Sequence, residues 1–271
     1  MQTTANLWDV LCRDLETQRT QLAAEQHHLA ASKFRETAEQ VFRPASPRLC
    51  DAIEIAGDVC QASGALDGAL TNFQDALKRN LAHGYIGAAA RVAAKLALLQ
   101  DYRDDYAAAR TYFVQALELY SASHDASQRC MLLNHLASLE KRSGDVPSAI
   151  RHFQEALDSA VQMHGEVHPE TALLCNNLGV AWTEAGDWVQ AENSHMRALG
   201  IREKLFGAMH PDVAESLGNL AVVYHASGRW DKAEAFYQAA LKTHAAFRKP
   251  GCPEMETVQA NYEKLQKDRR G

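Results

Sequence analysis

The feature that most constrains this chain is an internal repeat with a spacing of 40 to 42 residues. The segment beginning at His168 aligns without gaps on the segment beginning at His210. Further copies appear upstream when one turn position is aligned, and that position holds Gly64, Asp104, Gly144, Gly186 and Gly228. In all five copies an alanine follows five residues later and an Ala-Leu pair follows twelve residues later. A short unit repeated in this way buries its apolar face against neighbouring copies, so the sequence predicts a solenoid.

Each copy has the residue spacing of two antiparallel helices joined by a turn. A small residue lies seven positions before the turn, at Gly57, Ala97, Ala137, Gly179 and Ala221. A ring lies nine positions after the turn, at Phe73, Phe113, Phe153, His195 and Tyr237. Glycine tolerates the positive φ that ends a helix, and a small residue lets a second helix approach closely. We therefore predict an all-α chain, a right-handed superhelix with five helical hairpins over 46–250.

The two ends of the chain depart from the hairpin pattern and are predicted to cap it. Residues 1–45 contain leucines spaced by seven, at Leu15, Leu22 and Leu29, and are expected to form one long helix or a pair of helices. This segment either packs on the first repeat or associates with a second copy as a coiled coil. Residues 251–271 are expected to form a single capping helix with a basic tail.

A second motif, G-x-x-H-P-[ED], occurs at 165–170 and again at 207–212. Its glycine lies where a second helix is expected to end, and its histidine and proline begin the next first helix. Proline at the first helical position loses no needed hydrogen bond, and the acid after it meets the positive end of the helix. His164 lies four residues before His168, but the sequence places no set of carboxylates or cysteines beside them. We therefore expect a structural turn and no metal site.

No recognised catalytic motif is present, and we expect neither an enzyme nor a bound cofactor. The sequence lacks the HExxH, GxGxxG, GxxxxGK[ST] and GxSxG patterns. Its six cysteines form no CxxC pair and are expected to be reduced thiols. A net charge of −6 gives no support for binding nucleic acid. The sequence contains no run of about 18 apolar residues, so no membrane-spanning helix is expected. The N-terminus lacks the basic region of a secretory signal. We expect a cytoplasmic protein.

The repeat pattern resembles the tetratricopeptide repeat. The 42-residue period, the HP turn and the helix starts "NNLGVAW" and "GNLAVVY" resemble the kinesin light chain subtype, and the chain is most similar to stand-alone bacterial kinesin-light-chain-like proteins associated with bacterial tubulin. The resemblance covers 165–250 most clearly and 46–164 well. Asp104 departs from the usual turn glycine and His195 from the usual aromatic residue.

The resemblance implies a concave groove lined by the first helix of each hairpin. The protein-binding positions that it implies are Asn134, Ser138, Lys141, Arg142, Asn176, Asn177, Val180, Glu184, Glu215, Asn219, Val222 and His225. The asparagines either hold the backbone of an extended peptide or bond to the neighbouring repeat. Because Glu215 and Asn219 stand where the carboxylate clamp of chaperone-binding members needs basic residues, we do not expect that ligand. The groove starts with the acids Asp51, Glu54 and Asp58, which with the later bases favours a partner of mixed charge.

The implied function is that of a scaffold that binds another protein. By family analogy, we expect an accessory protein of bacterial tubulin filaments that links them to membrane. The alternative is a peptide-binding regulator or adaptor unrelated to the cytoskeleton. Contact with a lipid surface would use residues at the two ends of the chain, namely Trp8, Lys264, Lys267, Arg269 and Arg270.

Overall fold

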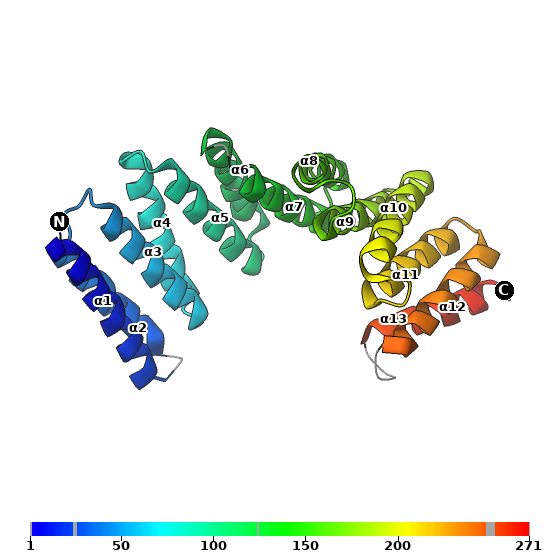
Figure 1. The fold of residues 1–271 in the computed structure, drawn as a ribbon, viewed down its shortest axis with the longest axis horizontal. Helices are drawn as coiled ribbons and strands as arrows, with labels where there is room; N and C mark the ends of the chain where they lie inside the picture. Colours follow the sequence, from blue (N-terminus) through cyan, green and yellow to red (C-terminus); the bar gives the residue numbers. More distant parts are fainter. Residues whose placement is uncertain (1, 24–25, 124, 248–252, 271) are drawn as a thin grey trace. The chain divides into compact units, whose positions relative to one another are not determined.

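The computed structural model describes residues 2–23, 26–123, 125–247 and 253–270, and within these ranges the only regular elements are helices (Figure 1). The helices are α1 (Gln2–Gln21), α2 (His27–Val41), α3 (Pro47–Ala62), α4 (Leu66–Ala82), α5 (Ile86–Tyr102), α6 (Tyr106–Ser123), α7 (Ala126–Arg142), α8 (Val146–His164), α9 (Pro169–Ala185), α10 (Trp188–Phe206), α11 (Pro211–Ala226), α12 (Trp230–Phe247) and α13 (Pro253–Asp268). The predicted all-α class is confirmed.

The chain forms two compact units, residues 1–132 and 133–271. In the first unit each helix from α1 to α6 packs on the next one in the chain. In the second unit the same holds from α8 to α13, and the first helices α9, α11 and α13 also contact one another in sequence. This nearest-neighbour packing is the arrangement of a helical solenoid.

The aligned columns of the repeat occupy equivalent places in the structure. The turn glycines have positive φ, at 77° for Gly64 and 78° for Gly186, and each first helix ends one or two residues before its turn position. The five rings and the two aligned alanine columns of the second helices are buried. A Cβ added to Gly57 would lie 2.5 Å from the Phe73 ring, so the small residue is what lets the two helices approach.

Both HP turns have the predicted structure. The helix α8 ends at His164, and Gly165 follows with φ 85°. His168 is the N-cap of α9, and its Nδ1 accepts a hydrogen bond from the backbone N–H of Glu170 at 3.2 Å. His210 caps α11 in the same way, so the structural role expected for these two histidines is confirmed.

The first 41 residues form a pair of helices, α1 and α2, rather than one long helix. Trp8 packs between Phe34 and Phe42, with ring centroids 6.4 and 5.9 Å away. Arg35 of α2 reaches α4, where it bonds Asp75 at 2.7 Å. The Trp8 contacts hold the N-terminal segment together, and the Arg35 bond connects it to the first hairpin.

The last helix, α13, covers the open side of the final hairpin. Val258 and Leu265 join the buried cluster formed by α11 and α12. The hydroxyl of Tyr262 donates to Glu234 of α12 at 2.9 Å. None of the described helices is long and apolar enough to span a membrane.

Candidate functional site: two pockets on the first helices of the second unit

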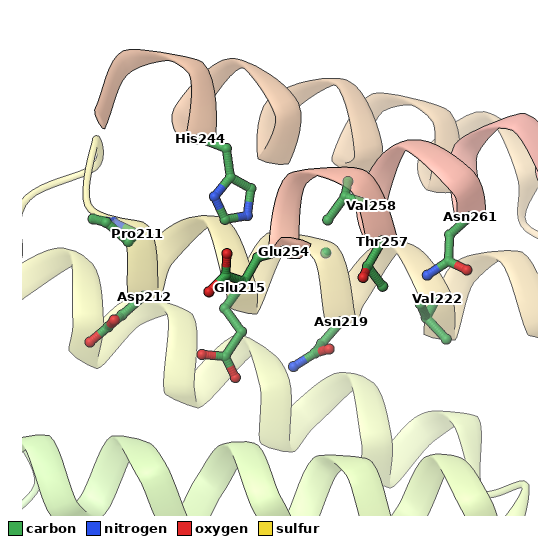
Figure 2. Close-up of a pocket in the computed structure, with 11 residues that line it drawn as sticks. Pro211, Asp212, Glu215, Asn219, Val222, His244, Glu254, Thr257, Val258 and Asn261 are labelled. Atoms are coloured by element: carbon green, nitrogen blue, oxygen red, sulfur yellow. The ribbon is translucent and has the colours of Figure 1, made fainter. Parts of the chain in front are cut away.

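The predicted protein-binding positions all lie on the first helices α7, α9 and α11, and several of them line two pockets in the second unit. The larger, the C-terminal pocket, has a volume of about 300 Å³ and lies among α11, α12 and α13 (Figure 2). Its wall contains the predicted residues Glu215, Asn219 and Val222. The smaller, the inner pocket, has a volume of about 230 Å³ and lies between α9 and α11. Val180, Glu184, Asn219 and Val222, all predicted, line it. Because Asn219 and Val222 belong to both walls, the pockets adjoin one another.

The C-terminal pocket is acidic and polar at its rim. Asp212, Glu215 and Glu254 contribute carboxylates to its lining, and Asn261 contributes an amide (Figure 2). Asn176 and Arg202 hold the Glu215 carboxylate, at 3.1 and 3.5 Å. An acidic pocket of this size suits a lysine or arginine side chain.

The inner pocket is built around an imidazole. His195 is 1% exposed, and its Nδ1 has no hydrogen-bond partner in the described part of the chain. Burial, together with the charge of nearby Arg202, lowers the pKa of His195 to about 4. The ring is therefore neutral at physiological pH. Val180 and Val222 supply apolar walls, so this pocket suits an apolar group.

The asparagines form hydrogen bonds between neighbouring repeats. Asn177 donates to Asn134 and Asn219 donates to Asn176, each at 2.9 Å. Asn176 is 5% exposed, so it acts as a bridge inside the solenoid. Asn134 and Asn177 are half-buried and each keep an amide atom for which the described contacts give no partner. Of the two interpretations of the asparagines, bonding to the neighbouring repeat holds for all four, while Asn134, Asn177 and Asn219 are half-buried and can also meet a peptide.

Of the other predicted groove residues, Ser138, Lys141 and His225 have partners within the protein. The Ser138 hydroxyl donates to the carbonyl of Asn134 in its own helix at 2.9 Å. Lys141 lies 3.8 Å from Glu184, and Arg142 is exposed. His225 bonds Asp268 of α13 at 3.0 Å and lines neither pocket.

The acidic start of the groove is neutralised within the first unit. Glu54 is 5% exposed and receives two hydrogen bonds from Arg91, each at 2.8 Å. Burial alone would raise the pKa of Glu54, but bonds from Arg91 and Lys95 leave it below its ordinary value. Lys95 also bonds Asp58 at 2.7 Å. The expected free acidic surface is therefore a set of ion pairs between neighbouring hairpins.

The residues predicted to meet lipid differ in availability. Trp8 is half-buried against aromatic residues and lies 5.9 Å below the Arg48 guanidinium. Arg269 is paired with Asp231 and Glu234 at 2.8 and 3.0 Å. The remaining basic residues, Lys264, Lys267 and Arg270, are exposed on the last turns of α13 and just beyond.

Sequence reasoning missed the half of the C-terminal pocket that α13 supplies. Glu254, Thr257 and Asn261 belong to this half. The register could have identified them, because Asn261 lies 42 residues after Asn219, as Pro253 does after Pro211. The capping helix thus continues the row of first helices, and its inner face extends the binding surface.

Two family models match the chain. The tetratricopeptide repeat model matches residues 128–204 and 174–245, and the soluble NSF attachment protein (SNAP) model matches residues 16–164. The two matches overlap at 128–164, where the same hairpin satisfies both, so both describe one kind of repeated helical pair. These families are scaffold folds rather than enzyme folds. No curated protein matches the sequence.

Solved structures with the same fold include a bacterial protein of the kinesin light chain type. BtubC (BKLC) from P. vanneervenii is 27% identical, with a TM-score of 0.68, and the match covers 85% of this chain and 95% of that one. The STAND protein PH0952 from Pyrococcus horikoshii, which has a tetratricopeptide repeat sensor, is 17% identical with a TM-score of 0.67, and the match covers 90% of this chain and 37% of that one. MamA is 17% identical with a TM-score of 0.58, and the match covers 75% and 98%.

Four observations agree on the tetratricopeptide repeat: the repeat columns, the capped HP turns, the packing of consecutive helices and the family matches. The resemblance to the tetratricopeptide repeat inferred from the sequence is confirmed, and its kinesin light chain character is supported by the similarity to BtubC. The chain belongs to the tetratricopeptide repeat proteins, and over residues 16–164 it also matches the SNAP family.

Proposed function

We propose that this chain is a non-enzymatic protein-binding scaffold and an accessory protein of bacterial tubulin filaments. The observation that carries the tubulin part is the similarity to BtubC, which extends over 95% of that protein at 27% identity. Sequence identity at this level, spread over nearly the whole length, supports more than a shared fold.

The binding surface of the proposed scaffold is the inner face of α9, α11 and α13. A partner segment lying across these helices places a lysine or arginine side chain in the C-terminal pocket, against Glu215 and Glu254. An apolar side chain enters the inner pocket between Val180 and Val222. The amides of Asn134 and Asn177 meet the segment's backbone further along.

The proposed link to membrane uses the basic end of α13. Lys264, Lys267 and Arg270 are exposed there, and three basic side chains give an attraction to anionic lipid of about 1 kcal/mol each. Trp8 is the weaker candidate because it packs against Phe34 and Phe42.

Co-sedimentation with assembled bacterial tubulin tests the filament proposal. The variant Glu254→Gln removes one pocket charge, and Glu256→Gln makes the same change on the same first turn of α13, where Glu256 faces away from the pocket. Since a charged partner group in a pocket contributes about 1.5–3 kcal/mol, we expect Glu254→Gln to weaken filament binding at least about tenfold. Glu256→Gln should bind as the wild type does.

Failure to pellet with filaments would overturn the tubulin proposal. Saturable binding of a basic peptide that Glu254→Gln weakens would then support the alternative, a peptide-binding regulator, which the two pockets favour.

Pelleting with liposomes tests the proposed contact with membrane. The double variant Lys264→Glu with Lys267→Glu should abolish pelleting with anionic vesicles and leave filament binding intact, and neutral vesicles should pellet neither protein.

A further inference from the structure

Three potential metal ligands meet at the turn between α8 and α9. His164 is the last residue of α8, His168 is the N-cap of α9, and Glu170 lies in the first turn of α9. One ligand atom from each of them lies within 4.8 Å of the other two. From the sequence we expected no set of carboxylates or cysteines beside this histidine pair, but Glu170 Oε2 lies 3.1 Å from His164 Nε2 and supplies a carboxylate ligand.

The spacing of these atoms suits a small divalent ion. Zinc binds imidazole nitrogen and carboxylate oxygen at about 2.0–2.2 Å, which places two ligands of a tetrahedral site about 3.3 Å apart. The ligand atoms of His164 and Glu170 are already close to that separation, at 3.1 Å, and a ligand atom of His168 lies within 4.8 Å of both. Two imidazoles and one carboxylate form a donor set used by first-row divalent ions, zinc among them.

The next turn of the same chain shows which of these residues the fold itself needs. There Phe206 takes the place of His164 and stacks on His210 with ring centroids 4.5 Å apart. His164 and His168 stack in the same way at 4.3 Å. A phenyl ring thus meets the packing requirement of the turn, and the imidazole of His164 adds a ligating nitrogen that the packing does not require.

The neighbouring charges leave the site open to an ion. Glu166 is the other acid of the turn, and it is paired with Arg197 at 2.7 Å. The side chains of His164 and Glu170 are each 33% exposed, so an ion can enter from solvent and keep at least one coordination position for water or a partner's ligand.

We propose that His164, His168 and Glu170 bind one divalent first-row transition-metal ion of the zinc type. The ion holds the end of α8 to the start of α9, across the junction between two hairpins. This site is independent of the two pockets and of the filament proposal.

Zinc titration of the full-length, chelator-treated protein tests the site. By isothermal calorimetry we expect one ion per chain at this site. The variant His164→Phe reproduces the stack of the sister turn, so it should fold as the wild type does and keep the His168 cap. It should nevertheless lose affinity by at least about 10- to 100-fold, since losing even an indirect metal partner costs that much. The control His83→Phe removes an exposed histidine whose ring is tilted against Tyr85, with centroids 6.1 Å apart, and should not change zinc binding.

Cobalt provides a second readout that reports ligand geometry. Co²⁺ should produce visible d–d absorption in the wild type and in His83→Phe. The absorption should be lost in His164→Phe and weakened in Glu170→Gln, while circular dichroism stays unchanged in all four proteins. Zinc binding by His164→Phe equal to that of the wild type would overturn the proposal, as would the absence of any zinc binding by the wild type.

Discussion

At the scale of single residues, the pairing of a small residue with a ring decides how closely two helices of a hairpin approach. Gly179 faces the His195 imidazole, and a Cβ added there would lie 2.7 Å from the ring. Gly57 faces Phe73 in the same way. In the other three copies the residue in this column is alanine, at Ala97, Ala137 and Ala221.

Gly179→Ala should therefore destabilise the protein by about 1–3 kcal/mol, because the imidazole and the helix must shift to admit the methyl group. Gly200→Ala is the matched control. Gly200 lies mid-way along α10 with nothing within 4 Å of an added Cβ, so alanine should stabilise the helix by about 0.5–1 kcal/mol. Urea unfolding followed by circular dichroism measures both. Midpoints that move in the same direction would contradict the steric explanation.

The buried imidazole also predicts a dependence on pH. The pKa of His195 is about 4 in the folded protein, below the unfolded value of about 6.5, because burial and then Arg202 disfavour its charged form. The unfolded chain therefore binds a proton that the folded chain rejects between these values. Stability should be unaffected above pH 6.5 and should fall as the pH drops towards 4, by about 3 kcal/mol at most.

His195→Phe should remove this component of acid sensitivity. The Gly57–Phe73 pair shows that a glycine in this column accommodates a phenyl ring. The test is the difference in unfolding free energy between variant and wild type at pH 7.5 and at pH 5, because all other titrating groups cancel in that difference. Relative to the wild type, the free energy of unfolding of the variant should be higher at pH 5 than at pH 7.5. An equal difference at both values would contradict the assigned pKa.

At the scale of elements, the helix ends follow the backbone requirements of the turn. Four of the five turn positions are glycines with positive φ, and the fifth, Asp104, has φ 58°. Aspartate tolerates this region better than most residues but at a cost in free energy. Its side chain offers partial compensation by accepting a hydrogen bond from Tyr106 at 3.2 Å.

Asp104→Gly should stabilise the first unit by about 0.5–1 kcal/mol through relief of the left-handed backbone. Gly144→Ala is the reverse test, because it places a Cβ at φ 88° and should cost about 1–2 kcal/mol. Thermal unfolding measures both, and hydrogen exchange in the last turn of α5 reports the first change locally. A lower stability of Asp104→Gly would show that the Tyr106 bond outweighs the backbone cost.

Sequence periodicity was sufficient to predict the helices and their turns, because each aligned column corresponds to one packing requirement. The rings, the small residues facing them and the caps at His168 and His210 all occupy their expected places. What could not be predicted depends on how neighbouring repeats approach each other. Periodicity does not show whether the Asn176 side chain meets a ligand or bonds to Asn219 of the next repeat. Nor does it show that the Glu170 carboxylate turns back towards His164. The ion pairs of Glu54 with Arg91 and Lys95 are likewise set by contacts between hairpins.

At the scale of the whole molecule, the two units differ in what their first helices offer to a partner. In the first unit the inner carboxylates of α3 are taken up by Arg91 and Lys95 of α5. In the second unit the corresponding faces of α9, α11 and α13 line two pockets. A repeat protein is stabilised locally where it is contacted, because each repeat interacts with its neighbours only. Binding of the partner should therefore stabilise helices of the second unit.

Hydrogen exchange with and without assembled bacterial tubulin tests this asymmetry on the intact chain. We expect slower exchange in α9, α11 and α13 and unchanged exchange in α3 and α5, since binding stabilises the helices that it touches. The variant Val222→Arg provides the matched control, because Val222 lines both pockets and a bulky cation there blocks them together. Protection should disappear in this variant. Protection confined to α3 and α5 would instead place the partner on the first unit and contradict the proposed binding surface.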